Sequence, residues 1–175
     1  MSEEELVRSA RQGDRDAFAG LVRSHEKRLL ALCWNMLGDR EEARDAAQDA
    51  LLQAFQNLER FDGGRGFAPW LLGIGAKRCL DRLRRRRTFL RYFRGHAGEW
   101  LGGETPRPEA AAEAETAGRL LQRLPARERA ALSLTVFEGF SAREVAAALG
   151  CSESTARVHV YNARVRLKKE VADEL

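Results

Sequence analysis

Hydrophobic residues recur along the chain at the three- and four-residue spacing of amphipathic helices, and no run of alternating β-branched residues favours strands. Between Asp14 and Gly38 this spacing gives one stripe, made of Phe18, Leu21, Val22, Leu29, Leu32, Cys33 and Met36. After Asp39 the inward positions are mostly small, namely Ala43, Ala46, Ala47, Ala50 and Ala54, with Leu51 and Leu58. Small inward residues allow helices to pack closely. The pattern predicts an all-α protein.

Local capping signals indicate where several of these helices begin and end. Ser2, Asp39 and Ser141 are each followed three residues later by glutamate, which is the spacing of an N-terminal capping box. Gly13 and Gly38 follow the first two apolar stretches, where glycine readily adopts the left-handed conformation that ends a helix. We therefore expect helix boundaries at these positions.

Residues 61–94 combine aromatic side chains, a glycine-rich loop and a helix that becomes steadily more basic. Phe61, Phe67 and Trp70 bracket the loop, which carries Arg65. The basic positions that follow are Lys77, Arg78, Arg82, Arg84, Arg85, Arg86, Arg87, Arg91 and Arg94. Because bases stack on aromatic rings and cations follow phosphates, this combination suits unpaired nucleic acid. The alternative for the same residues is a core tryptophan beside a solvated arginine face.

Charge supports nucleic acid as a partner. The chain has 175 residues, a formal net charge of +4 and a pI of about 9.3, and its length allows one domain or two small ones. The basic excess is concentrated after Lys77 and again after Arg157, which favours nucleic acid, with an acidic membrane surface as the competing partner. No segment approaches the roughly 20 apolar residues of a membrane span, and the acidic N-terminus is unlike a signal peptide. We therefore expect a cytoplasmic protein with no direct membrane insertion.

Cysteines, histidines and acids show no pattern typical of a catalytic or metal site. Cys33, Cys79 and Cys151 are scattered and form no CxxC motif, which fits free thiols in a reducing compartment, and the first two fall at core positions. The histidines have no ligand spacing with cysteines or acids, so we predict no metal and no cofactor. An enzyme acting on nucleic acid is disfavoured, because there is no carboxylate cluster near the basic helix, no Ser/His or Cys/His pairing and no GxxxxGK loop.

Residues 95–117 differ from the flanking sequence, since glycine, proline, alanine and glutamate accumulate there and the apolar period fades. Such a composition is typical of a flexible linker. A second helical unit is expected from Gly118, with inward positions at Leu120, Leu121, Leu124, Ala130, Leu134 and Phe137. The chain is thus predicted to form two helical domains, residues 1–94 and 118–175, joined by this linker.

Residues 141–169 have the pattern of a helix-turn-helix. Gly150 suits the turn, and Ser152 can cap the second helix. The core positions are expected to be Val145, Ala146, Leu149, Ala156, Val160, Ala163 and Leu167. The outward face of the second helix would carry Arg157, Val158, His159, Tyr161, Asn162, Arg164, Lys168 and Lys169. Since a helix with such groups fits the major groove, this face is predicted to read base edges, the alternative being a helical hairpin with a solvated basic face.

The chain resembles, over nearly its whole length and in two successive parts, bacterial sigma factors of the extracytoplasmic-function (ECF) group, the small two-domain class. The segments GDREEARDAAQDALLQAFQNLERFDG and FAPWLLGIGAKRCLDRLRR are similar to region 2 of that family. The segment RLPARERAALSLTVFEGFSAREVAAALGCSESTARVHVYNARVRL is similar to its region 4. The resemblance implies a four-helix domain, a helix-turn-helix domain and a non-enzymatic role in directing RNA polymerase to specific promoters.

The resemblance also implies roles for individual residues. Docking on the β′ clamp helices of core polymerase is expected of Asp45, Gln48, Asp49, Leu52 and Gln53. Capture of the unpaired minus-ten strand is expected of Phe61, Arg65, Phe67, Trp70, Lys77 and Arg78. Recognition of the minus-thirty-five element is expected of Arg157, Val158, Tyr161 and Asn162, with His159 and Arg164 nearer phosphates. Further implied partners are the polymerase β flap and an anti-sigma factor.

The sequence departs from the family pattern at several DNA-facing positions. Lys77 stands where asparagine is frequent, Val158 where a small polar residue is usual, and His159 and Asn162 where arginine is usual. These differences affect the expected promoter sequence rather than the role. The alternative function is an autonomous helix-turn-helix regulator whose N-terminal domain senses a ligand or partner, and which binds duplex DNA as a dimer without polymerase.

Overall fold

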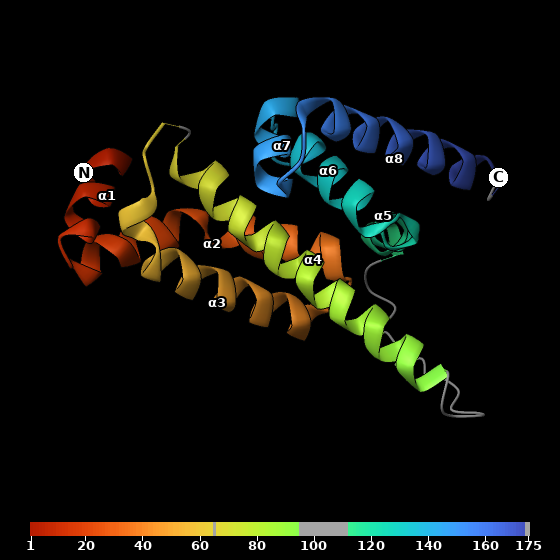
Figure 1. Ribbon diagram of the computed structural model, residues 1–175, viewed down its shortest axis with the longest axis horizontal. Helices are drawn as coiled ribbons and strands as arrows, with labels where there is room; N and C mark the ends of the chain where they lie inside the picture. Colours follow the sequence, from red (N-terminus) through yellow and green to blue (C-terminus); the bar gives the residue numbers. More distant parts are fainter. Residues whose placement is uncertain (65, 95–111, 174–175) are drawn as a thin grey trace.

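The computed structural model describes residues 1–64, 66–94 and 112–173, which form eight α-helices and one short 3-10 helix without a strand (Figure 1). The helices are α1 (Glu3–Arg11), α2 (Arg15–Leu37), α3 (Arg40–Gln56), η1 (Leu58–Arg60), α4 (Phe67–Arg94), α5 (Ala112–Arg123), α6 (Ala126–Val136), α7 (Ala142–Leu149) and α8 (Glu153–Asp173). The all-α prediction is confirmed for this part of the chain. The segment 95–111, most of the predicted linker, lies outside the described residues.

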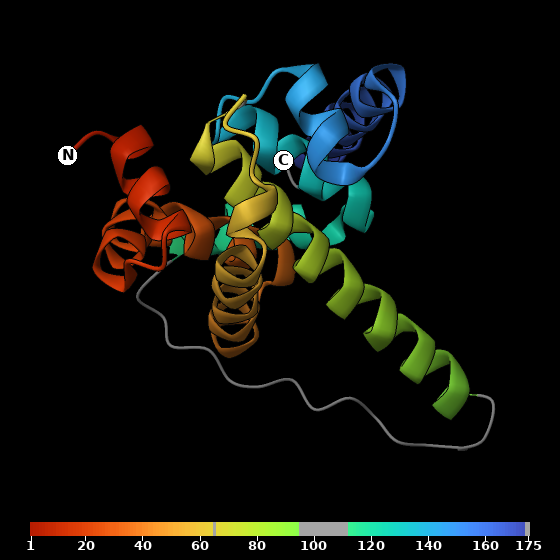
Figure 2. The ribbon, with the colours of Figure 1, turned by 60° about the vertical axis from the view of Figure 1, so that its left-hand side comes forward.

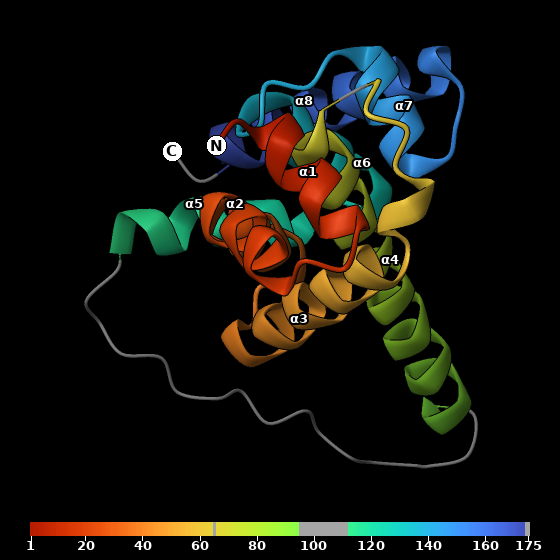
Figure 3. The ribbon, with the colours of Figure 1, turned by 90° about the vertical axis from the view of Figure 1, so that its left-hand side faces the viewer.

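The N-terminal unit is a helical bundle in which α2, α3 and α4 pack against one another and α1 covers one end of α2 (Figure 3). The alanines of α3 are buried at the contact, as their small size and spacing predict. Gly75 of α4 faces α2 so closely that a Cβ atom there would lie 2.5 Å from Leu29 Cδ1. Cys33 and Cys79 are buried as free thiols, as expected from their apolar neighbours.

The capping signals place the helix ends where the sequence predicts them. Ser2 and Glu5 exchange backbone-to-side-chain bonds of 2.7 and 3.2 Å, and Ser141 and Glu144 form the same reciprocal arrangement. At the start of α3 the Glu42 N–H donates to Asp39 Oδ1 at 2.8 Å. Short-range hydrogen bonds therefore fix these boundaries before any long-range packing is considered.

Two local predictions for the C-terminal unit are wrong. Helix α5 begins at Ala112, six residues before the predicted start at Gly118, because the alanines and glutamates read as linker are strong helix formers. Phe137 is 56% exposed rather than buried, since α6 ends at Val136. After the turn at Gly139, Phe140 enters the core instead, and its N–H donates to the Leu134 carbonyl at 3.0 Å.

Helices α6, α7 and α8 form the predicted helix-turn-helix unit, with α7 and α8 joined at Gly150. Gly150 ends α7 at a φ of 64°, in the left-handed region that glycine adopts readily. Ser152 accepts a hydrogen bond from the Thr155 N–H at 3.1 Å and thereby caps α8. Ala156 and Ala163 of α8 are fully buried and mark the side of this helix that faces the core.

The two units pack against each other, chiefly through α4 on α7 and α2 on α5 and α6. A Cβ atom at Gly73 of α4 would lie 3.4 Å from the Cα of Ala148 in α7, so the backbones approach closely. Buried Arg129 donates to the Met36 carbonyl and Gln122 donates to the Asn35 carbonyl at 2.9 Å. These bonds satisfy carbonyls at the C-terminal end of α2. The C-terminal part of α4 projects beyond both units (Figure 2).

Candidate nucleic-acid interface

The three aromatic residues around the glycine-rich loop form one cluster. The ring centroid of Trp70 lies 5.1 Å from that of Phe61 and 5.7 Å from that of Phe67. Phe61 and Phe67 are only 4% and 1% exposed, whereas Trp70 is half-buried. In this conformation Trp70 is therefore the ring of the three that presents the most accessible edge. Arg65, which we predicted to act with them, lies outside the described residues.

The N-terminal helix holds this cluster in place through contacts that the sequence pattern does not reveal. Glu3 accepts a hydrogen bond from His25 Nε2 at 2.8 Å and another from the Phe67 N–H at 3.2 Å. The His25 ring packs on the Phe67 ring with centroids 5.5 Å apart. The Glu3 carboxylate thus connects α1, α2 and the start of α4. It thereby fixes the position of the Phe67 ring, against which Trp70 packs.

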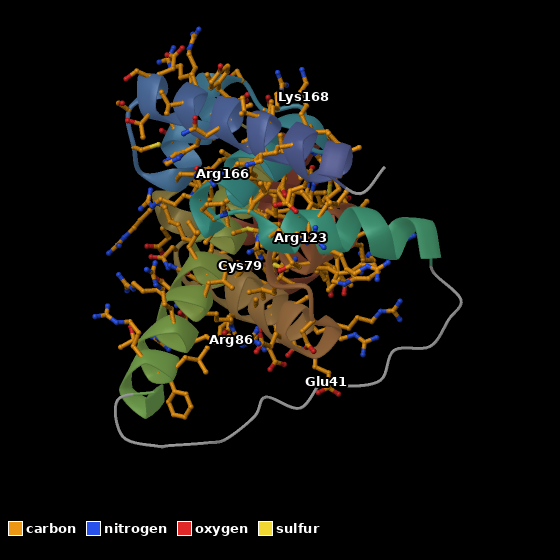
Figure 4. All side chains as sticks on the ribbon, turned by 90° about the vertical axis from the view of Figure 1, so that its right-hand side faces the viewer. Glu41, Cys79, Arg86, Arg123, Arg166 and Lys168 are labelled. Atoms are coloured by element: carbon orange, nitrogen blue, oxygen red, sulfur yellow. The ribbon has the colours of Figure 1, made fainter. Side chains whose placement is uncertain are left out.

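The basic residues of α4 are presented to different degrees. Lys77 is exposed, while Arg78 is half-buried and donates to Gln53 Oε1 at 2.7 Å. Arg82, which was not among the predicted site residues, donates to Asp49 Oδ2 at 2.6 Å. The following arginines, Arg84, Arg85, Arg86 and Arg87, are exposed. Figure 4 labels Arg86 on this helix. The outer surface of α4 is therefore a cationic strip whose first part is hydrogen-bonded to α3.

The predicted polymerase-docking residues share one stripe on α3, as their spacing requires. Asp45, Gln48 and Asp49 are exposed, and Gln53 is half-buried against α4. Leu52 is 57% exposed in the middle of this stripe. The stripe therefore presents one apolar side chain among polar ones to solvent.

The predicted recognition residues lie on the solvent side of α8. Arg157, Val158, Tyr161 and Arg164 are exposed, and the side chains of His159 and Asn162 are half-buried. Tyr161, at 68% exposure, is the most open of the large hydrophobic residues on this helix. Arg157 Nη2 lies 2.5 Å from Glu153 Oε1, one turn earlier. All six predicted residues therefore lie on one helix, four of them exposed and two half-buried.

Three further observations concern what the described residues can do. A hydrogen bond with Cys33, followed by burial, raises the pKa of the Cys79 thiol far above its ordinary value, so this thiol is no nucleophile at neutral pH. The described residues include no group of three or more histidine, cysteine, aspartate or glutamate side chains placed to hold a metal ion. Nor does any helix among them have the length and apolar character needed to cross a membrane.

Comparisons with known proteins match both units. The family model for Sigma-70 region 2 matches residues 21–89, and that for Sigma-70, region 4 matches residues 115–167. The ECF RNA polymerase sigma factor SigM of Mycobacterium tuberculosis is 34% identical over 171 residues, which cover 96% of this chain and 84% of SigM. SigW of Bacillus subtilis, also an ECF RNA polymerase sigma factor, is 27% identical over 95% of each chain.

Solved structures agree with the sequence relatives. The structure of CnrH in complex with the cytosolic domain of CnrY matches with a TM-score of 0.74 at 25% identity, over 99% of each chain. The sigma factor RpoE of Bartonella quintana, solved with the anti-sigma factor NepR, has the same fold, with a TM-score of 0.72 over 89% of this chain and 96% of that one. From the two matched regions and the identity to SigM, the chain belongs to the ECF group of RNA polymerase sigma factors within the sigma-70 family.

Proposed function

We propose that this sigma factor directs core RNA polymerase to specific promoters and helps to open them by capturing the melted non-template strand. The observation that supports this most strongly is the presence, in one chain, of an exposed recognition helix and a separate cationic strip beside an aromatic cluster. Residues 1–94 would act on the minus-ten element and residues 118–175 on the minus-thirty-five element, with residues 95–117 between them.

The recognition helix α8 would bind the minus-thirty-five element as intact duplex. Arg157, Val158, Tyr161 and Asn162 would face base edges in the major groove, while His159 and Arg164 would lie nearer phosphates. The exposure of Arg157 and Tyr161 supports this arrangement, because they can reach a groove without any change in the fold.

The aromatic cluster and the start of the basic strip would bind the minus-ten element as a single strand. Duplex opening costs about 1.4 kcal/mol of stacking per base-pair step, which a captured base would partly offset. Trp70 would stack on such a base, with Phe61 and Phe67 forming the pocket floor. The loop residue Arg65, with Lys77 and Arg78, would hold the phosphates of the freed strand.

The stripe on α3 would dock on the β′ clamp helices of core polymerase, and the C-terminal unit would contact the β flap. The factor would then act in the cytoplasm, where the polymerase works. An anti-sigma factor would be a further partner, since RpoE of Bartonella quintana, which aligns with 89% of this chain, was solved with the anti-sigma factor NepR. In this role the chain binds rather than catalyses and uses no cofactor.

The proposal is tested by run-off transcription on a promoter library with core polymerase and the purified chain. We expect promoter-dependent transcripts only when both are present, and we expect the Arg157→Ala variant to lose the dependence on the upstream element. The result that would contradict the proposal is a chain that ignores core polymerase and shifts a duplex operator as a symmetric dimer. That behaviour would identify an autonomous helix-turn-helix regulator.

A further inference from the structure

Two side-chain hydrogen bonds join the predicted polymerase-docking stripe to the basic strip. Arg82 Nη2 donates to Asp49 Oδ2 at 2.6 Å, and Arg78 Nε donates to Gln53 Oε1 at 2.7 Å. Asp49 and Gln53 are four residues apart on α3, and so are Arg78 and Arg82 on α4. The pairs run in opposite order along the two helices, so both bonds lie on the same side of one helix-helix contact.

These four residues belong to surfaces with different expected ligands. Asp49 and Gln53 are part of the stripe that would dock on polymerase, whereas Arg78 is part of the surface that would hold the melted strand. The Arg82–Asp49 bond is accessible from solvent, since the Asp49 side chain is 52% and the Arg82 side chain 31% exposed, whereas the Arg78–Gln53 bond is part-buried. A ligand of either surface can therefore compete most directly for one partner of the Arg82–Asp49 pair.

The acidic side chains of α3 interact more strongly with Arg82 than with the arginines that follow it on α4. The hydrogen bond to Asp49, and then the charges of Asp49, Asp45 and Glu42, raise the pKa of Arg82. The next arginine, Arg84, instead pairs with Asp81 of its own helix at 3.3 Å. A phosphate that approaches Arg82 must displace a carboxylate, so Arg82 is a weaker phosphate ligand while Asp49 holds it.

We propose that Arg82 is a further contact for the melted strand and that Asp49 masks it in the free chain. Polymerase docking on Asp49 and Gln53 withdraws both acceptors and releases Arg82 and Arg78 toward phosphate. Strand binding in turn frees Asp49 and Gln53 for polymerase, because such coupling is reciprocal. This inference rests on the proposed function, and it predicts that the basic strip binds a single strand more tightly once polymerase is bound.

The first test measures the free chain binding a short fluorescent single-stranded oligonucleotide of mixed sequence by anisotropy over a range of salt concentrations. Asp49→Asn should tighten binding about 2- to 5-fold, the range of an exposed ion pair. It should also steepen the slope of log K against log salt by about 0.7, the value for one added phosphate contact on a single strand. Glu41→Gln removes the same charge from an exposed position of α3 and should give a smaller change.

The double variant Asp49→Asn/Arg82→Gln should lose the gain in oligonucleotide affinity. Its slope of log K against log salt should equal that of the wild type or be shallower. If Asp49→Asn binds the oligonucleotide no more tightly than Glu41→Gln, with an unchanged salt slope, the masking is overturned. The two bonds would then serve only to hold α3 against α4. Circular dichroism of each variant confirms that the comparison is made between folded chains.

The second test measures binding to core polymerase without DNA. Arg82→Gln keeps the docking residues and removes the partner of Asp49, so it should bind core about 2- to 5-fold more tightly. Arg84→Gln, which removes the same charge from α4, should bind core as the wild type does. Equal affinities for the two variants would overturn the coupling while leaving the sigma-factor role intact. A wild-type chain that neither binds core nor supports promoter-dependent transcription would instead remove the proposed function, and the inference with it.

Discussion

The recognition helix and the aromatic cluster differ in how many of their proposed DNA-binding side chains are exposed in the free chain. On α8, Val158 and Tyr161 are 53% and 68% exposed, on a helix whose inner side is buried at Ala156 and Ala163. In the aromatic cluster, Phe61 and Phe67 belong to the hydrophobic core of the N-terminal unit, and the nearby Arg78 and Arg82 are bonded to α3. With the proposed roles, duplex reading would be carried by a preformed surface, whereas strand capture would depend on groups that also hold the fold together.

The largest expected effect concerns the aromatic side of this comparison. Phe67→Ala should lower the free energy of unfolding by about 3–5 kcal/mol, because it removes a fully buried ring and leaves a cavity. Urea denaturation followed by circular dichroism measures this change. Tyr161→Ala on α8 is the matched aromatic control and should alter stability by less than about 0.5 kcal/mol. An equal loss of unfolding free energy in the two variants would contradict the contrast between a buried aromatic cluster and an exposed recognition helix.

Separating the two units should sharpen the comparison. Gly73→Leu inserts a side chain where a Cβ atom would already lie 3.4 Å from the backbone of Ala148, and such overpacking costs about 1–3 kcal/mol. Small-angle X-ray scattering should show a larger radius of gyration. Gly118→Leu in α5, where nothing lies within 4 Å, is the control. An unchanged radius for Gly73→Leu would show that the contact between α4 and α7 does not hold the units together.

A change on the recognition helix should affect binding without affecting stability. Arg157→Gln should weaken recognition of the minus-thirty-five element by about 1–3 kcal/mol, the value of a good contact to a base edge. Its unfolding curve should match that of the wild type, because the side chain is exposed. Promoter binding by the holoenzyme, compared between the native and a scrambled upstream element, measures the effect. A weaker affinity for both elements alike would point to a phosphate contact instead.

The smallest expected effect tests whether Arg157 is free to read DNA. Its ion pair with Glu153 is exposed and spans one helical turn, so it is worth only about 0.3–0.5 kcal/mol. Glu153→Gln should therefore raise duplex affinity of the holoenzyme slightly, measured by anisotropy at low salt. A loss of affinity would show that Glu153 positions Arg157 rather than competing for it.

The capped helix boundaries and the recognition helix could be predicted from the sequence because they depend on neighbouring residues. Ser2, Ser141 and Gly150 act through hydrogen bonds or backbone angles within one turn. The inward positions Ala156 and Ala163 follow from the helical repeat alone, and both are buried. The family resemblance, confirmed by the matched regions, then supplied the functional interpretation of these elements.

Long-range contacts could not be predicted in the same way. The pairing of Arg82 with Asp49 joins residues 33 positions apart, and the burial of Arg129 depends on the carbonyl of Met36, 93 positions away. The aromatic cluster illustrates the same limit, because the sequence marks Phe61 and Phe67 as rings near cations without revealing that they are core residues. The tertiary structure decides which of the predicted DNA-binding side chains are exposed and which are buried in the core.

Permanganate footprinting of the reconstituted holoenzyme tests most directly whether the aromatic cluster acts in strand capture and the recognition helix in promoter binding. On a promoter that the wild-type holoenzyme opens, Trp70→Ala should still form the closed complex but lose the reactivity of unpaired thymines. Arg157→Ala should instead lose promoter occupancy. An unchanged open-complex signal for Trp70→Ala would contradict the account, because strand capture would then not depend on the aromatic cluster.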